Sequence, residues 1–296
     1  MRNAKALIVF LSCILANYAS AETIESRVVE DGGTGPYSAI MATDASLPTH
    51  TLFRPNNIAA QGDEKLPIVV WGNGACFDSP WEHVNFLNEI ASHGFMVVAI
   101  GTMPTEDGEQ KTERSSSSKL TDAIDWAIAQ NESENSPYHK ALDTTEIGVA
   151  GMSCGGLQAL DVADDPRVST LGVFNSGIFN EPPKDPLPGI PNLTKKQLEN
   201  IHTPTLYLLG GESDIAYGNG MNDVERIDHV PVFVGNMDVG HGGTYGQPHG
   251  GEFARVATAW FKWQLKDDET AGKLFTGNPP GLAEHPEWTV DKKNMP

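Results

Sequence analysis

The stretch GVAGMSCGGLQA, residues 148–159, decides the fold because it places Ser153 in a G-x-S-x-G pattern. A strand-like apolar run at 145–151 precedes the serine, and a helical pattern at 154–162 follows it. Glycines on both sides suit a sharp turn with no room for side chains, which lifts the serine hydroxyl clear of a sheet beside a helix N-terminus. We interpret Ser153 as a candidate nucleophile; the alternative is a glycine-rich turn with an incidental serine.

Strand-like and helical patterns alternate along the rest of the chain. Strands are expected at 49–55, 66–72, 95–101, 145–151, 169–177, 204–211 and 230–235, and helices at 80–94, 118–130, 154–162 and 251–266. Strands that are apolar throughout are typical of a sheet buried on both faces. The alternation predicts an α/β fold with a mostly parallel central sheet and helices on both faces.

The ends of the chain differ from its middle. Residues 1–21 have a basic start, an apolar run and small residues at a cleavage site, which is typical of a signal peptide too short to anchor the protein in a membrane. We therefore expect a secreted or periplasmic protein without a membrane anchor, with one catalytic domain at 22–296. Residues 268–296 are expected to form an extension packed on that domain, and the proline-rich stretch 179–192 a loop over the strand ends.

The protein is strongly acidic, with a formal net charge of −19. The leader holds two basic residues and no acidic one, so its removal gives −21. Such a surface repels nucleic acid and anionic lipid headgroups, and it argues against polyanionic substrates. Only Cys76 and Cys154 remain after cleavage, as one disulfide or two inert thiols.

A nucleophilic serine needs a histidine as base and an acid that orients the histidine. In α/β folds with a serine turn of this kind, the three residues follow along the chain in the order Ser, Asp, His. Asp214 lies just past the strand at 204–211, with Glu212 as its rival closer to the strand end. His241 lies on the short loop that leaves the last strand, and His249 is its competitor. We predict that Asp214 is the acid and His241 the base. The alternative for Asp214 is that it belongs to an exposed acidic turn.

A tetrahedral intermediate needs two N–H donors. We assign one to Cys154, which follows the serine, and the other to Ala75 in the loop after 66–72, with Cys76 as the next candidate. Because amides that converge on one oxygen lie close together, this arrangement predicts a Cys76–Cys154 disulfide between the loop and the serine turn. Two separate buried thiols are the alternative.

Five motifs within residues 64–266 carry a resemblance to a known family: WGNGAC, IASHGFMVVAI, GMSCGG, PTLYLLGGESD and VGHGG. They resemble α/β-hydrolases of the group that contains dienelactone-hydrolase-like esterases, bacterial cutinases and polyester hydrolases. The resemblance implies an α/β-hydrolase fold, a triad of Ser153, Asp214 and His241, an oxyanion hole from Ala75 and Cys154, and no cofactor or metal.

The sequence departs from polyester hydrolases at two places. Ala75 stands where they usually carry an aromatic residue, and their substrate-clamping tryptophan aligns near Ile178 or Phe179. Dienelactone hydrolases proper use a cysteine nucleophile, whereas position 153 is serine. Five aromatic residues are candidates to line an apolar cleft, with core packing as the alternative: Trp71, Phe77, Phe179, Tyr217 and Tyr245.

The resulting hypothesis is an exported serine carboxylesterase that acts on a small or polymeric ester through an acyl-enzyme. A serine peptidase or amidase would share the triad and differ in its leaving group. A non-catalytic binding protein on a hydrolase scaffold is the third interpretation.

Overall fold

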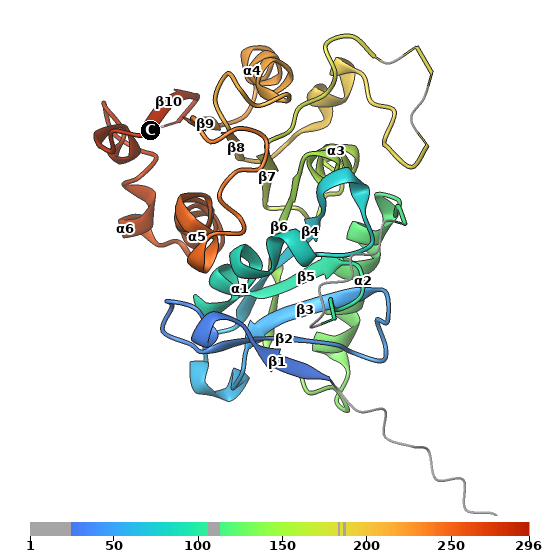
Figure 1. Cartoon of the computed structure of the whole chain (residues 1–296). Coiled ribbons are helices and arrows are strands. Elements are labelled where there is room, and N and C mark those ends of the chain that lie inside the picture. The colour runs from blue at the N-terminus through green and yellow to red at the C-terminus, as the bar shows by residue number, and fades with distance from the viewer. Residues whose placement is uncertain (1–24, 106–112, 183, 186–187, 296) are drawn as a thin grey trace, which may run out of the picture.

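A computed structural model describes residues 25–105, 113–182, 184–185 and 188–295, so the expected signal peptide at 1–21 lies outside it. The described residues form a ten-stranded sheet in the order β1-β2-β3-β5-β4-β6-β7-β8-β9-β10 (Figure 1). Its centre is parallel and consists of β4 (Leu66–Gly72), β5 (Met96–Ile100), β6 (Leu142–Met152), β7 (Thr170–Phe174), β8 (Thr205–Leu209) and β9 (Val232–Met237). The predicted mostly parallel sheet is confirmed.

Antiparallel strands extend this centre at both ends. On one side lie β1 (Ser26–Val28), β2 (Ala39–Ala42) and β3 (His50–Pro55), with β3 paired to β5. On the other side β10 (Trp288–Lys293) pairs with β9. The sequence pattern predicted β3 but neither the short β1 and β2 nor β10.

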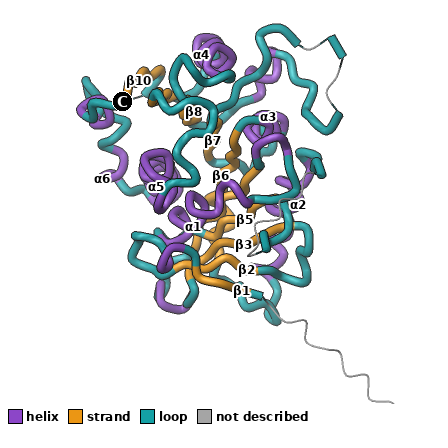
Figure 2. The backbone as a smooth tube through the Cα atoms, in the orientation of Figure 1, coloured by secondary structure: helices purple, strands orange, loops and turns teal. Residues whose placement is uncertain are grey.

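Helices cover both faces of the sheet, as expected (Figure 2). One face packs against α1 (Val84–Ser92) and α5 (Gly251–Lys266), and the other against α2 (Ser118–Glu132), α3 (Cys154–Asp161) and α4 (Tyr217–Arg226). In β4, Ile68 and Val70 point to the second face, whereas Val69 and Trp71 point to the first. This alternation explains why the strand is apolar throughout.

The tail after α5 contains a short helix and the edge strand β10 of the sheet. Asp267 ends α5 in the left-handed conformation, and α6 (Glu269–Gly272) follows. Trp288 of β10 is 5% exposed; its ring centroid lies 5.6 Å from that of Phe253, and its indole N–H donates to Glu252 at 3.0 Å. The extension therefore completes one edge of the sheet.

Two helical details differ from the sequence pattern. The expected helix 80–94 begins as a 3-10 turn, Trp81–His83, and continues as α1. Helix α4 was not predicted, since its sequence is polar and contains Gly218 and Gly220. Gly220 is needed there, because a Cβ atom would lie 2.6 Å from the carbonyl oxygen of Ser176. No helix in the described ranges is long and apolar enough to cross a bilayer.

Candidate active site

Ser153 lies in a tight turn between β6 and α3. Its φ is 54° and its ψ is −116°, a backbone conformation that residues other than glycine rarely adopt. A Cβ atom on Gly155 would lie 2.0 Å from the carbonyl oxygen of Gly72, and one on Gly151 would lie 2.3 Å from the Gly155 backbone. The two glycines therefore allow β6, β4 and α3 to meet behind the serine.

The turn brings together three side chains from different parts of the chain. His241 Nε2 lies 3.0 Å from Ser153 Oγ, and His241 Nδ1 lies 2.6 Å from Asp214 Oδ1. Asp214 follows β8 and His241 follows β9, so both lie at the same end of the parallel sheet as Ser153. These contacts have the geometry of a nucleophile, a base and an orienting acid.

Asp214 is held as a carboxylate by a set of donors. It is 4% exposed, and burial alone raises the pKa of a carboxyl group. Hydrogen bonds from His241, from the amides of Ala216 and Gly210, and from Asn175 outweigh burial and lower the Asp214 pKa below its ordinary value. Asp214 thus stays charged beside the imidazole.

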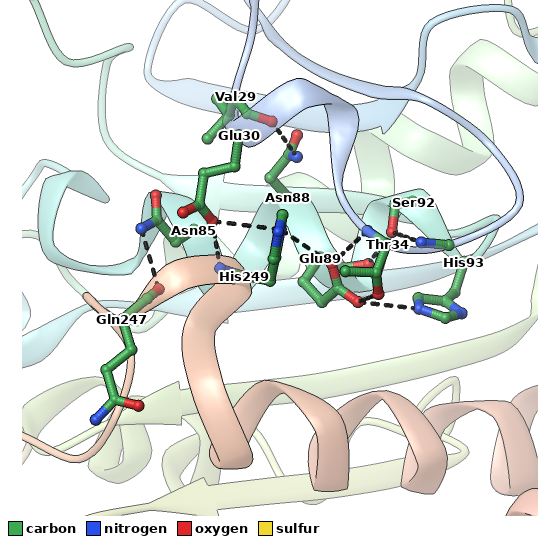
Figure 3. Close-up of polar contacts among 11 residues, drawn as sticks. Val29, Glu30, Thr34, Asn85, Asn88, Glu89, Ser92, His93, Gln247 and His249 are labelled. Carbon is green, nitrogen blue, oxygen red and sulfur yellow. Dashed lines mark hydrogen bonds and ion pairs between the residues drawn. The ribbon is translucent and has the colours of Figure 1, made fainter.

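Neither rival residue reaches this arrangement. Glu212 is exposed in the same turn as Asp214. Figure 3 shows His249 among the acidic side chains of the N-terminal segment and α1. Its amide donates to Glu30 at 2.5 Å, and its Nδ1 lies 3.6 Å from Glu30 Oε2 and 3.8 Å from Glu89 Oε2.

Asn175 and Tyr245 form a second layer that the sequence reasoning missed. The fully buried Asn175 donates to Asp214 at 2.8 Å and to the Gly240 carbonyl at 3.2 Å, and it accepts from the Tyr245 hydroxyl at 2.6 Å. It therefore joins the acid to the loop that carries His241. In the sequence, the feature that indicates Asn175 is its position as a polar residue near the carboxyl end of the apolar run 169–177.

The loop after β4 lies against the serine turn. Cys76 and Cys154 form a disulfide with a Cα–Cα distance of 5.0 Å, which confirms the predicted pairing. Ala75 has φ 52°, and the Cys76 amide donates to the Asn73 carbonyl at 3.1 Å. Because the Cys76 amide is engaged, Ala75 remains the better candidate of the two for an oxyanion donor.

A cleft of about 760 Å³ opens beside the three side chains. Met152 and Gly242, the neighbours of Ser153 and His241 in sequence, line it. Of the five predicted cleft aromatics only Tyr245 does so, whereas Trp81, which the sequence reasoning missed, lines it and is 46% exposed. The complete lining is Arg27, Trp81, Glu82, His83, Val84, Asn85, Thr105, Met152, Gly242, Tyr245 and Gly246.

The position expected for a clamping tryptophan holds no exposed ring. Ile178 is fully buried, and its amide donates to Asp223 at 2.8 Å. Phe179 is half-buried against the core. Across the part of the chain that the structure describes, no group of three or more His, Cys, Asp or Glu residues is placed to hold a metal ion.

The fold and the contacts at Ser153 define the class, an α/β-hydrolase with the constellation of a serine hydrolase. Residues 51–286 match the PETase family model, described as PET hydrolase-like. The match covers most of the chain, so this protein belongs to that family of carboxylic ester hydrolases. A comparison with curated proteins gave no match.

Proposed function

We propose that this protein is an exported serine carboxylesterase in which Ser153, His241 and Asp214 carry out the reaction. The observation that supports it most directly is His241, which contacts Ser153 Oγ through one ring nitrogen and Asp214 through the other. The hydrogen bond to Asp214 places a proton on Nδ1 and leaves Nε2 free to accept one.

The reaction follows from this geometry. His241 takes the hydroxyl proton of Ser153 as Oγ attacks the ester carbonyl carbon. The tetrahedral intermediate collapses, the bond to the alcohol oxygen breaks, and His241 returns the proton to the leaving alcohol. Water, activated by the same imidazole, then releases the acid from the acyl-enzyme and restores Ser153.

The proposed oxyanion donors are the amides of Ala75 and Cys154. Cys154 begins α3, so its amide belongs to a helix N-terminus, where negative charge is stabilised. The disulfide fixes its residue next to the loop that carries Ala75. Donors held in place before the reaction need no rearrangement when charge develops on the carbonyl oxygen.

Export is part of the proposal. The disulfide is typical of oxidising compartments, and residues 1–21 have the composition of a signal peptide. The family indicates polyesters as a substrate class. Since Ala75 replaces an aromatic residue and no exposed ring stands at Ile178 or Phe179, we expect soluble esters to be better substrates than a polymer surface.

Active-site labelling tests the proposal. A fluorophosphonate probe should label the wild-type protein at Ser153 and fail to label Ser153→Ala, which should also lose about 10⁶-fold in kcat. Labelling of the variant would place the nucleophile elsewhere. A panel of p-nitrophenyl esters and matched p-nitroanilides then separates an esterase from a peptidase, because only a peptidase would turn over the anilides at a comparable rate.

A further inference from the structure

The loop that carries the proposed oxyanion donor has an unfavourable backbone conformation. Ala75 has a φ of 52° and Cys76 a φ of 57°, so two consecutive residues other than glycine lie in the left-handed region. Such conformations persist only where the surrounding structure holds them. The disulfide holds the side chain of Cys76, but a disulfide does not fix the peptide planes of the loop.

The segment 113–115 lies along this loop and holds one of its carbonyls. Ser115 donates to the Cys76 carbonyl oxygen twice, from its amide at 2.9 Å and from its hydroxyl at 3.2 Å. The fully buried side chain of Gln158, on α3, donates in turn to the Ser115 carbonyl at 2.9 Å. The helix that begins after Ser153 therefore supports the segment that supports Cys76.

Arg114 holds the carbonyl of Ala75. Its Nε donates to that oxygen at 3.2 Å, and the side chain of Arg114 is exposed. The Cys76 amide, which belongs to the same planar peptide, donates to the Asn73 carbonyl at 3.1 Å. Both ends of this peptide are thus fixed. Ala75 cannot rotate toward a more favourable conformation, which would redirect its amide, without the loss of a hydrogen bond.

The end of the proline-rich loop holds Arg114 itself. Arg114 Nη1 donates to the Pro188 carbonyl at 2.7 Å. Gly189 has a φ of 73°, and a Cβ atom there would lie 2.8 Å from the Cβ atom of Arg114. Glycine is needed at this position both for its backbone conformation and for the close approach to the arginine.

We propose that Arg114 is a positioning residue of the oxyanion hole, which fixes the Ala75 peptide so that the Ala75 amide faces the developing oxyanion, and that Pro188 and Gly189 hold Arg114 for this task. The proposal rests on the proposed esterase function. It gives the proline-rich loop a part in turnover, although its contact is with a residue outside the triad.

The kinetics of Arg114→Met are the first test, because methionine keeps an unbranched side chain and removes both hydrogen bonds. Acylation and deacylation both pass through an oxyanion, so kcat should fall about 2- to 10-fold, with KM changed by less than about 2-fold. This is less than the ~10²–10³ that loss of a donor itself costs, because Ser115 and the disulfide still hold Cys76. Arg114→Lys, which keeps a charged donor, should recover part of the loss.

An inhibitor pair separates the oxyanion hole from general damage to the site. A trifluoromethyl ketone adds Ser153 Oγ to its carbonyl carbon, and the resulting oxyanion occupies the hole while His241 takes the proton. The methyl ketone with the same carbon chain binds as the unreacted ketone. In Arg114→Met the Ki of the first should rise by about the factor that kcat loses, and the Ki of the second should stay at the wild-type value. The pH midpoint of kcat/KM should also stay unchanged, since Arg114 donates to the carbonyls of Ala75 and Pro188.

A double-mutant cycle tests the part of the loop. Gly189→Ala should displace Arg114 and lower kcat in the same direction as Arg114→Met. In the Arg114→Met background, Gly189→Ala should add little to the loss, because its effect passes through the arginine. Fully additive losses would overturn the coupling between the loop and Arg114.

Arg226→Met is the matched control. Arg226 is also exposed, and its Nε donates to Asn222 at 2.9 Å on α4, so the variant removes the same charge away from the oxyanion loop and should keep wild-type kinetics.

The outcomes distinguish this inference from the proposed function. A wild-type kcat in folded Arg114→Met, an equal rise in Ki for both ketones, or no recovery in Arg114→Lys overturns the role of Arg114. If Arg114→Met does not fold, Arg114→Lys and Gly189→Ala, each with the inhibitor pair, give the answer. Absence of ester hydrolysis in the wild type overturns the proposed function itself.

Discussion

His241 and His249 lie on the same segment between β9 and α5, and each has carboxylates beside it. His241 Nδ1 is 2.6 Å from a fully buried Asp214 side chain, and its other nitrogen contacts Ser153. His249 Nδ1 lies 3.6 and 3.8 Å from Glu30 and Glu89, beyond hydrogen-bond length, and its side chain is 39% exposed.

The difference shows that a carboxylate neighbour alone does not give a histidine the contacts that a general base needs. His241 has a short bond to a carboxylate that four donors hold, and a nucleophile on its other face. His249 lies in a polar cluster that joins the N-terminal segment, α1 and the turn before α5, where Asn88 also donates to Val29 and Thr34 to Glu89 (Figure 3). That cluster joins three segments, and the contacts of His249 within it are to the carboxylates of Glu30 and Glu89.

Removal of each histidine is the sharpest test of this comparison. His241→Ala should lose about 10⁶-fold in kcat, because Ser153 then has no base. His249→Ala should keep the activity within a few-fold of wild type. Steady-state kinetics on a p-nitrophenyl ester give both values, and a reversal of the two results would move the base to His249.

The acid that orients His241 should have the next largest effect. In Asp214→Asn the amide no longer fixes the reactive tautomer of the imidazole, so kcat should fall by about 10⁴-fold with little change in KM. Glu212→Gln is the matched control, since Glu212 is an exposed carboxylate of the same turn. Equal losses in the two variants would show that the charge of the turn, not Asp214, supports catalysis.

A disulfide joins the Ser153 turn to the loop after β4, whereas polar contacts join His249 to the segments around it. The Cys76–Cys154 disulfide joins residues 78 apart, and chain entropy attributes about 4 kcal/mol of stability to such a closure. The double variant Cys76→Ser, Cys154→Ser should therefore show a clearly lower Tm and a lower kcat. Thiol titration of the unfolded, unreduced protein should find no free thiol at these positions, and two free thiols would contradict the bond.

Loss of the contact between Glu30 and His249 should have the smallest effect on stability. Glu30→Gln weakens the contact with His249, and because both side chains are partly exposed, the cost should be at most about 1 kcal/mol, roughly 2–4 °C in Tm. Activity should stay at the wild-type level. Glu199→Gln, an exposed glutamate of the 3-10 turn at 195–200, is the control; a Glu30→Gln effect on kcat would show that this cluster positions the base.

The sequence by itself determined the fold class, and it predicted the order of the proposed reactive groups along the chain. Apolar strands alternating with amphipathic helices leave few arrangements that bury both kinds of surface. The pattern around Ser153 requires a turn without side chains, and parallel strands bring the residues after β8 and β9 to the same edge of the sheet. The disulfide also followed, because the two cysteines flank groups that must converge.

Only the tertiary structure decided which residues complete the site. Asn175 and Tyr245 act through contacts between residues 70 apart, and no local pattern encodes such a bond. His83 and Trp81 lie in the same short 3-10 turn, and only the packing around them decides that His83 is buried, with a lowered pKa, while Trp81 is exposed. The edge strand β10 forms by pairing with β9. Its own sequence is short and polar and does not indicate a strand, because strand formation depends on the neighbouring strand.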